Sequence, residues 1–306
     1  MKSNAILVIP ALSVALALSA NVSAATVGLT LPGSGVVISP ITNICQGALN
    51  CPALGLDLQP GYSAPAQASF NGSWSTTNAS ENLTGTGYAS VGVLKDSSSV
   101  TVTSGDYPVT EIYGDAASFV EDTITISDPS LTGATGDLVL GMSIDGTGSD
   151  PTYTDGIGTN AGFDVFAGAA QEGLPPATYF GITDGSISSS YSGPEVPFTY
   201  GQPFGIELYF ESVAGVYCLM DCSPWGGLPL SATADGSDTA ILDSLTVYDS
   251  NGNIVPSANW SVTSGSGQVY AADGVVPEPS YGVLLAGMAL ILALVRRATR
   301  AARQES

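Results

Sequence analysis

The sequence predicts an all-β protein: a single antiparallel β-sandwich or jelly-roll-like domain, flanked by an N-terminal signal helix and a C-terminal transmembrane helix. Short β-prone runs alternate with clusters of Gly, Asp, Ser and Pro along the body of the chain. No window between the two ends shows sustained 3.6-residue periodicity, so helices are not expected there. The body of about 250 residues suits one large β domain, and the lack of a repeat of fixed period disfavours a propeller or a solenoid.

Two segments show the period-two alternation of half-buried antiparallel strands most clearly. In 123–127, Ile124 and Ile126 share one face and the hydroxyl residues share the other. In 204–211, apolar side chains alternate with Glu207 and Glu211, which we expect on the opposite, solvated face. The expected strands are 88–94, 107–113, 117–127, 136–144, 163–167, 179–183, 198–200, 204–211, 240–248 and 259–263.

Residues 239–270 form the best-defined supersecondary unit. The strand at 240–248 leads directly into Asp249-Ser250-Asn251-Gly252-Asn253. An Asn-Gly pair is favoured in a type I′ turn because both central positions must reach positive φ. The sequence therefore predicts a β-hairpin that reverses at Asn251-Gly252.

Residues 1–25 have the features of a secretory signal peptide. Lys2 supplies one positive charge, residues 5–18 are apolar, and small residues follow at 22–25. We expect cleavage after Ala24 or Ala25. An N-terminal membrane helix is the alternative, but the apolar stretch is short for one and runs directly into a cleavage-type site.

The C-terminal segment 276–306 begins with Val276-Pro277-Glu278-Pro279, continues with an uncharged apolar run at 280–295 and ends in a basic tail. Roughly 20 apolar residues cross a bilayer core, so this shorter run spans one only with tilt or local thinning. Basic residues stay on the cytoplasmic side, which predicts an exported body. A plain single-pass anchor and a buried core helix are the alternatives, but a core helix fits poorly because an all-round apolar helix at the chain end has nothing to pack against. The basic residues are Arg296, Arg297, Arg300 and Arg303.

These three parts, in this order, resemble the PEP-CTERM sorting signal of Gram-negative bacteria. The resemblance implies recognition in the inner membrane by an exosortase-type transpeptidase, which removes the helix and delivers the body to the cell surface or the exopolysaccharide matrix. Pro277, Glu278 and Pro279 match the motif, and the arginines match its basic tail, although 301–306 runs past it. Residues 64–270 resemble the ectodomains of uncharacterised proteins with this tail, which implies a β-sandwich and no particular activity.

The expected organisation follows from these signals. A signal peptide occupies 1–25, an N-terminal extension with a local disulfide occupies 26–63, and the β-sandwich ectodomain occupies 64–273. The sorting signal occupies 274–306, with its transmembrane helix at about 280–295 and its basic tail at 296–306. The extension is punctuated by Gly and Pro and offers at most one strand.

The charge of the body excludes several classes of partner. Residues 25–277 carry one basic residue, Lys95, against 25 acidic residues, a formal charge of −24. Such a surface repels phosphate, which excludes nucleic acid and disfavours docking on anionic lipid. Solubility outside the cell is the simpler interpretation of this charge, and attraction of divalent cations is the alternative. The chain has no histidine, which excludes Ser-His-Asp and Cys-His nucleophile systems and histidine-liganded zinc.

The four cysteines form two close pairs, Cys45 with Cys51 and Cys218 with Cys222. An even count in an exported chain indicates disulfides, and four cysteines allow three connectivities. We expect the two local pairings, which tighten turns more than they hold the fold together. A zinc site of four thiolates is the alternative, although the spacings differ from those of usual knuckles and an oxidising compartment opposes it.

The body has candidate residues for three kinds of chemistry: calcium binding, glycoside hydrolysis and carbohydrate binding. Asp249–Asn253 alternates oxygen side chains as calcium loops do, but the twelfth position is Trp260 rather than an acid, and a turn explains the same residues. Calcium is therefore the one cofactor left open. A glycosidase needs two carboxylates across a cleft, and carbohydrate binding would use exposed aromatic rings. The candidate acids are Glu111, Glu121, Asp122, Glu207 and Glu211, and the candidate rings include Trp74, Trp225 and Trp260.

The sequence favours an exported, non-catalytic protein of the cell surface or the exopolysaccharide matrix. A carbohydrate-binding module, with or without calcium, is the first alternative. A carboxylate-dependent glycoside hydrolase is the second. A sheet face lined with exposed Tyr or Trp would favour the first alternative, and a cleft with paired carboxylates the second.

Overall fold

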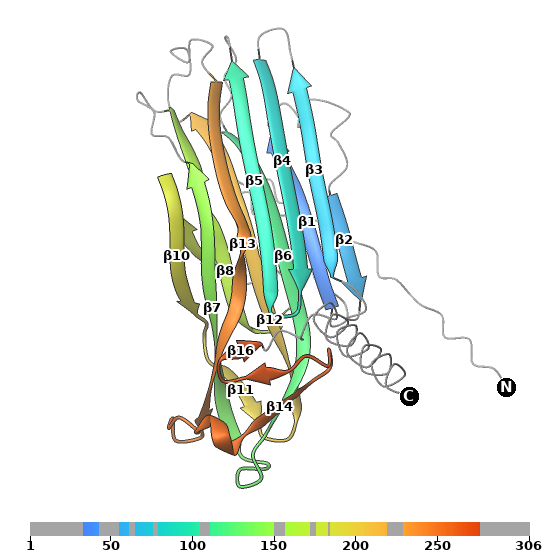
Figure 1. Ribbon diagram of the computed structural model, residues 1–306, viewed down its shortest axis with the longest axis vertical. Coiled ribbons are helices and arrows are strands. Elements are labelled where there is room, and N and C mark those ends of the chain that lie inside the picture. Colours follow the sequence, from blue (N-terminus) through green and yellow to red (C-terminus); the bar gives the residue numbers. More distant parts are fainter. Residues whose placement is uncertain are drawn as a thin grey trace, which may run out of the picture.

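Two antiparallel seven-stranded sheets pack face to face in a sandwich, which confirms the predicted all-β class (Figure 1). The computed structural model describes residues 33–42, 55–60, 65–75, 79–104, 111–149, 157–171, 176–182, 184–218 and 229–275. The long strands of both sheets run along the long axis of the molecule (Figure 1). The core lies between the two sheets, as expected of a sandwich.

Sheet A has the strand order β2-β1-β6-β12-β8-β9, and β14 also pairs with β6. The centre of this sheet is β12, which is antiparallel to β6 on one side and to β8 on the other. The strands are β1 (Gly33–Thr42), β2 (Gly55–Pro60), β6 (Glu111–Ser127), β8 (Ile157–Ala169), β9 (Thr178–Gly181), β12 (Pro203–Cys218) and β14 (Ser261–Ser264).

Sheet B has the order β10-β7-β13-β5-β4-β3, and β11 also pairs with β7. Its strands are β3 (Ala66–Ser75), β4 (Ala79–Ser90), β5 (Val93–Ser104), β7 (Thr135–Ser149), β10 (Asp184–Ser192), β11 (Val196–Thr199) and β13 (Pro229–Asp249). A short 3-10 helix, η2 (Ser257–Asn259), and a two-stranded hairpin of β15 (Tyr270–Ala271) and β16 (Gly274–Val275) follow β13. They lie toward the lower end of the sandwich in Figure 1.

The alternation predicted from the sequence sets the core. Ile124 and Ile126 on β6 are fully buried, as are Phe163 on β8 and Phe210 on β12. The rings of Phe163 and Phe210 stack with centroids 5.1 Å apart. Burying each such side chain stabilises the fold by about 1.5–3 kcal/mol.

Several predicted strand bounds differ from the structure: 179–183 and 198–200 run past the ends of β9 and β11, and 107–110 lies outside the described residues. Two differences are informative. The run at 88–94 is not one strand, because β4 ends at Ser90 and the chain reverses before β5 begins at Val93. Gly92 makes this turn with a φ of 79°, a conformation that side chains disfavour. The run at 259–263 is a strand only from Ser261, because Asn259 ends η2.

The turn after β13 exists, but its type differs from the prediction. The N–H of Gly252 donates to the carbonyl of Asp249 at 2.9 Å, so Ser250 and Asn251 are its central residues. The Asp249 carboxylate also accepts the N–H groups of Asn251 and Asn253, at 2.8 and 2.9 Å. These bonds favour a turn closed by Gly252 at φ 77° over the predicted type I′ turn centred on Asn251-Gly252.

The sandwich begins earlier in the chain than expected. Both β1 and β2 come from the segment that we expected to be an extension with at most one strand, and β1 pairs with β6 of sheet A. Val36 of β1 is fully buried in the main core, which explains why this segment joins the sheet.

Several predicted features lie outside the described residues. These are the signal peptide with Ala24 and Ala25, the sorting signal with Val276–Pro279 and its arginines, and Cys45, Cys51 and Cys222. Cys218 is the last residue of β12, and only its backbone is described. Within the described ranges, no helix has the length and apolar character needed to cross a membrane.

Candidate functional site

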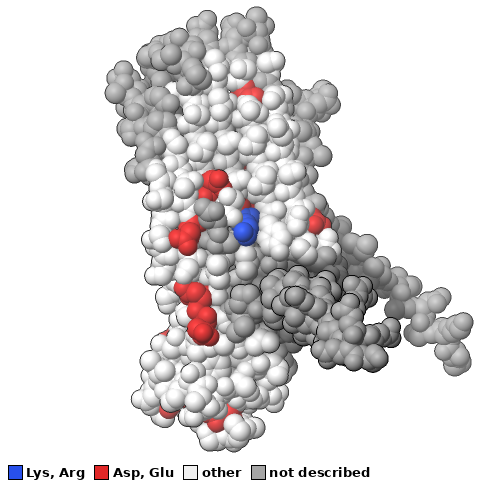
Figure 2. Space-filling view, viewed as in Figure 1, with Lys and Arg blue, Asp and Glu red and all other residues white. Residues whose placement is uncertain are grey.

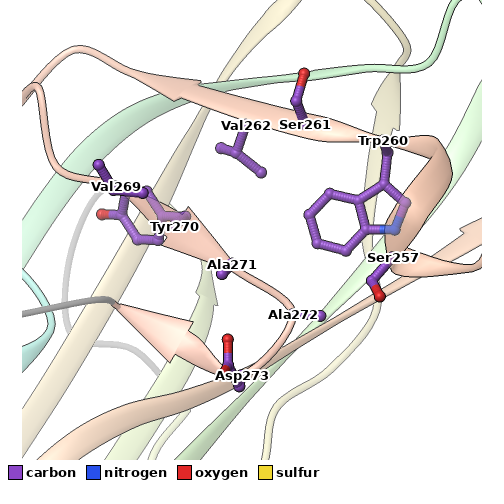
Figure 3. Close-up of a pocket in the computed structure, with 9 residues that line it drawn as sticks. All are labelled: Ser257, Trp260, Ser261, Val262, Val269, Tyr270, Ala271, Ala272 and Asp273. Atoms are coloured by element: carbon purple, nitrogen blue, oxygen red, sulfur yellow. The ribbon is translucent and has the colours of Figure 1, made fainter.

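A pocket of about 730 Å³ lies beside Trp260, between β14 and the β15–β16 hairpin (Figure 3). Apolar side chains, among them Trp260, Val262 and Ala271, make up much of its lining. Ser257 and Asp273 add a hydroxyl and a carboxylate. The volume falls within the range of small-molecule sites, about 300–1,000 Å³.

Local backbone structure sets the position of the Trp260 side chain. The N–H of Asn259 donates to the carbonyl of Pro256 at 2.9 Å, which forms η2 and turns the chain toward β14. The indole Nε1 of Trp260 donates to the carbonyl of Val255 at 3.2 Å. In Figure 3 the six-membered ring of Trp260 therefore extends into the pocket, and its nitrogen lies on the side of η2.

Asp122 of β6 holds the opposite wall of the pocket in place. This buried carboxylate accepts hydrogen bonds from the hydroxyl of Tyr270 at 2.8 Å and from Ser266, whose Oγ and N–H donate at 2.5 and 3.2 Å. The three bonds join β6 to the turn after β14 and to β15. Asp122, a candidate acid in the sequence, is therefore a structural link behind the pocket.

A second cluster lies on the face of sheet A that is turned away from sheet B. Since side chains alternate along β12, Tyr209 points to this face while Leu208 and Phe210 enter the core between the sheets. Tyr209 packs with Ala117, Phe119 and Phe166, and all four are 3–5% exposed. Leu58 and Ala177 pack against them.

Five carboxyl groups share this face, and we call them the outer carboxylate cluster. They are Asp115, Glu121, Asp164, Glu207 and Glu211. Glu211 lies directly opposite Asp164 of β8, and Glu207 lies directly opposite Glu121 of β6. Directly opposite side chains have Cβ atoms about 4.5–5.5 Å apart, a distance at which like charges repel.

Glu207 and Glu211 are buried, at 5% and 7% exposure, so the expectation that they lie on a solvated face was wrong. The face prediction itself was right, because both alternate with the core residues of β12. Burial raises the pKa of Glu207 to about 8, with a further contribution from Glu121. Burial also raises the pKa of Glu211 to about 7, and Asp164 adds to the increase although the Tyr209 hydroxyl donates to Glu211 and opposes it.

Asp115 and Asp164 complete the cluster. Burial raises the pKa of Asp115 well above its usual value, and Glu211 and Asp164 raise it further. Burial likewise raises the pKa of Asp164. Asp115 Oδ1 and Glu207 Oε2 have no hydrogen-bond partner among the described residues. Glu207 and Glu211 therefore hold protons near neutral pH that free carboxyl groups would have lost.

Lys95 of β5, the sole basic residue within the described ranges, belongs to sheet B and lies remote from this face. The surface seen in Figure 2 is largely uncharged, with separate acidic patches and one small basic one. No group of three or more acidic or cysteine side chains in the described part of the chain has the arrangement of a metal site.

Other carboxyl groups are buried away from this cluster, and Asp96 is an example that lies between the sheets. Asp96 of β5 is 1% exposed and accepts a hydrogen bond from the hydroxyl of Ser118 on β6. Burial raises its pKa well above the usual value. The burial of Asp96 has no signal in the local sequence, because the residues that follow it in β5 are polar.

The candidate acids and tryptophans named from the sequence lie in separate parts of the structure. Glu121 lies opposite Glu207, Glu211 lies on the same face four residues further along β12, and Trp260 lines the pocket. Only backbone is described for Glu111 and Trp74, and Trp225 lies outside the described residues. The side-chain oxygen atoms of Asp249 accept hydrogen bonds within its own turn, which favours the turn over a calcium loop.

Asp115, Asp164 and Tyr209 were missed by sequence reasoning. One signal existed: residues 116–120 are almost continuously apolar, as expected of a strand that is buried on both faces. This apolar run predicts that side chains on both faces of β6 are buried, including those on the face turned away from sheet B. The pairing of Glu211 with Asp164 depends on strand register and has no signal in the local sequence.

Comparisons with known proteins do not assign the chain to a family. No protein-family model and no curated protein matches it. Among solved structures, it matches one described as the crystal structure of infectious bursal disease virus VP2 subviral particle. The match has 12% identity, covers 89% of this chain and 71% of that chain, and has a TM-score of 0.08, so it carries no argument.

Proposed function

We propose that the protein is exported, is sorted through the inner membrane by an exosortase-type transpeptidase, and serves as a non-catalytic component of the cell surface or the exopolysaccharide matrix. The sorting motif Val276–Pro279, the apolar run and the basic tail support the route. The acidic body, with Lys95 as its one basic residue, suits a soluble matrix component and opposes nucleic-acid partners.

One observation about the site carries the non-catalytic part of the proposal. Acid–base hydrolysis of a glycoside needs two carboxyl groups across a cleft. Asp273 supplies the one carboxylate among the residues that line the pocket. Glu211 and Asp164, which lie directly opposite each other, share the outward face of sheet A with Tyr209 and Phe166. The acids and the pocket are therefore separate.

Carbohydrate binding is the second candidate, and the pocket beside Trp260 favours it. A large ring that is partly accessible, next to a hydroxyl and a carboxylate, is the combination that a sugar ring requires. A calcium-assisted version has less support, because the Asp249 carboxylate is engaged within its own turn.

The sorting proposal is tested by replacing Pro277, Glu278 and Pro279 together with alanine in the native host. We expect the variant to remain as an unprocessed precursor in the inner-membrane fraction, detected by its larger mass and by fractionation. Gln304→Ala, in the basic tail, is the matched control and is expected to be processed normally. Normal release of the triple variant would refute the sorting assignment.

The non-catalytic proposal has its own test. Purified protein is incubated with neutral and acidic polysaccharides, and the appearance of reducing ends is measured over time. We expect no increase over a buffer control. Release of reducing ends that the Glu211→Gln variant abolishes would show that the protein is a hydrolase.

A further inference from the structure

We infer that the pocket beside Trp260 binds a short segment of a neutral polysaccharide, with the indole ring as its stacking platform. This inference rests on the proposed matrix location and names the kind of ligand that would hold the protein there. It is argued from three properties of the pocket: its ring, its polar rim and its charge.

The ring is held in place but not enclosed. Trp260 and Val262 pack against the main core, and both are only partly buried, so the core supports them from one side. The hydrogen bond from Nε1 to Val255 prevents the indole from turning away. The ring thus reaches the pocket with its orientation already set (Figure 3), which lowers the entropy cost of binding.

The rim supplies hydrogen-bonding groups close to this ring. Ser257 and Ser261 carry hydroxyls that both donate and accept, and Asp273 carries a carboxylate that accepts. A sugar ring has an apolar face of C–H groups and a rim of hydroxyls, so it matches an aromatic platform bordered by such groups. The volume of about 730 Å³ gives room for a short oligosaccharide.

The negative charge of the pocket and of the body favours neutral sugars over acidic ones as ligands. Asp273 is exposed at the pocket, and no lysine or arginine is among the residues that line it. The body as a whole carries a formal charge of −24. A uronate carboxylate would meet repulsion without a compensating cation, whereas a neutral sugar would not.

Tyr179 offers a useful comparison. This aromatic residue of β9 is 45% exposed, and it lies on sheet A outside the pocket. Its hydroxyl donates to Asn160. A Tyr179→Ala variant therefore removes an exposed ring of similar kind and leaves the pocket intact.

The test is calorimetric titration of the full-length protein in a polyoxyethylene detergent, which has no sugar head group to compete. The ligands are cellohexaose, mannohexaose and hexagalacturonate. We expect saturable heat with at least one neutral hexasaccharide and at least tenfold weaker binding of the uronate. Trp260→Ala should weaken the neutral interaction at least tenfold, and Asp273→Ala several-fold, while Tyr179→Ala should leave it within twofold.

Folding of each variant is checked by circular dichroism, and Trp260→Phe serves as the conservative variant. The phenylalanine ring is expected to restore at least a third of the lost affinity, expressed on a logarithmic scale. The inference is overturned if neither neutral hexasaccharide binds, if the uronate binds more tightly, or if Tyr179→Ala rather than Trp260→Ala abolishes binding. Sorting of the alanine triple variant is measured separately, so a failure of saccharide binding leaves the export proposal to its own test.

Discussion

The outer carboxylate cluster makes the stability of the fold depend on pH in the direction opposite to ordinary acid denaturation. Glu207 and Glu211 titrate at about 8 and about 7 in the folded protein, against 4.5 for an exposed glutamate. Because the folded-state pKa values are raised, the folded protein binds more protons than the unfolded chain between these values. The stabilisation is therefore complete below about pH 4.5 and is lost as the pH rises through 7 and 8.

The magnitude follows from the size of the shifts. One pKa unit corresponds to about 1.4 kcal/mol, so the shift of Glu211 alone corresponds to about 3 kcal/mol. Asp115 and Asp164 face Glu211 and shift in the same direction. Since water and structural relaxation weaken such effects, we expect the whole cluster to remove about 3–5 kcal/mol of the free energy of unfolding between pH 5 and pH 9. A domain has about 5–15 kcal/mol in total, so the loss is measurable.

The assay is urea unfolding at pH 5, 7 and 9 at constant ionic strength, followed by fluorescence. Repulsion within the acidic body acts in the same direction, so Glu211→Gln is compared with Asp145→Asn. Both variants remove one carboxyl group, but Asp145 is exposed. We expect Glu211→Gln to raise the free energy of unfolding at pH 9 by about 1–3 kcal/mol and to change it little at pH 5. If the two variants are equally stable at pH 9, the buried cluster is not the cause.

Three further substitutions test the architecture by the same unfolding assay. Phe210→Ala should cost about 3–5 kcal/mol, because it leaves a cavity beside Phe163 in the core; a cost below 1 kcal/mol would contradict this packing. Asp122→Ala should cost about 2–3 kcal/mol by leaving three donors without their acceptor, and full stability would show that the link behind the pocket is dispensable. Gly252→Ala should cost about 1 kcal/mol because of the positive φ, and a stabilising effect would refute the turn assignment.

The sequence predicted most of the strands because alternation within one strand is a local property. The faces of 123–127 and 204–211 were correct for this reason. The reversal at Gly92 was missed since a single glycine between apolar residues reads equally well as part of a strand. The burial of Glu211 could not be inferred locally, because it depends on side chains of β6 and β8 that lie far away in the chain.

Only part of the candidate site could be predicted from the sequence. Trp260 was one of three candidate tryptophans in the sequence. The pocket also needs Ala271 and Asp273 from the β15–β16 hairpin, which have no distinctive composition. The role of Asp122 likewise requires Tyr270 to lie beside β6, 148 residues away in sequence. These contacts depend on strand register and on packing between residues far apart in the chain, and local sequence patterns do not predict either.

The end of β16 at Val275 limits how far the folded body can stand from the apolar run that begins at 280. Four residues separate them, and the five Cα–Cα steps from 275 to 280 span at most about 18 Å when fully extended. While the run is held in a membrane, as proposed, the β15–β16 hairpin is tethered close to the lipid surface, and the Trp260 pocket that it lines is confined with it. Cutting the chain within those four residues would remove the tether. The proposed processing would then release the protein and, in the same step, free the proposed binding pocket to reach a polymer away from the membrane.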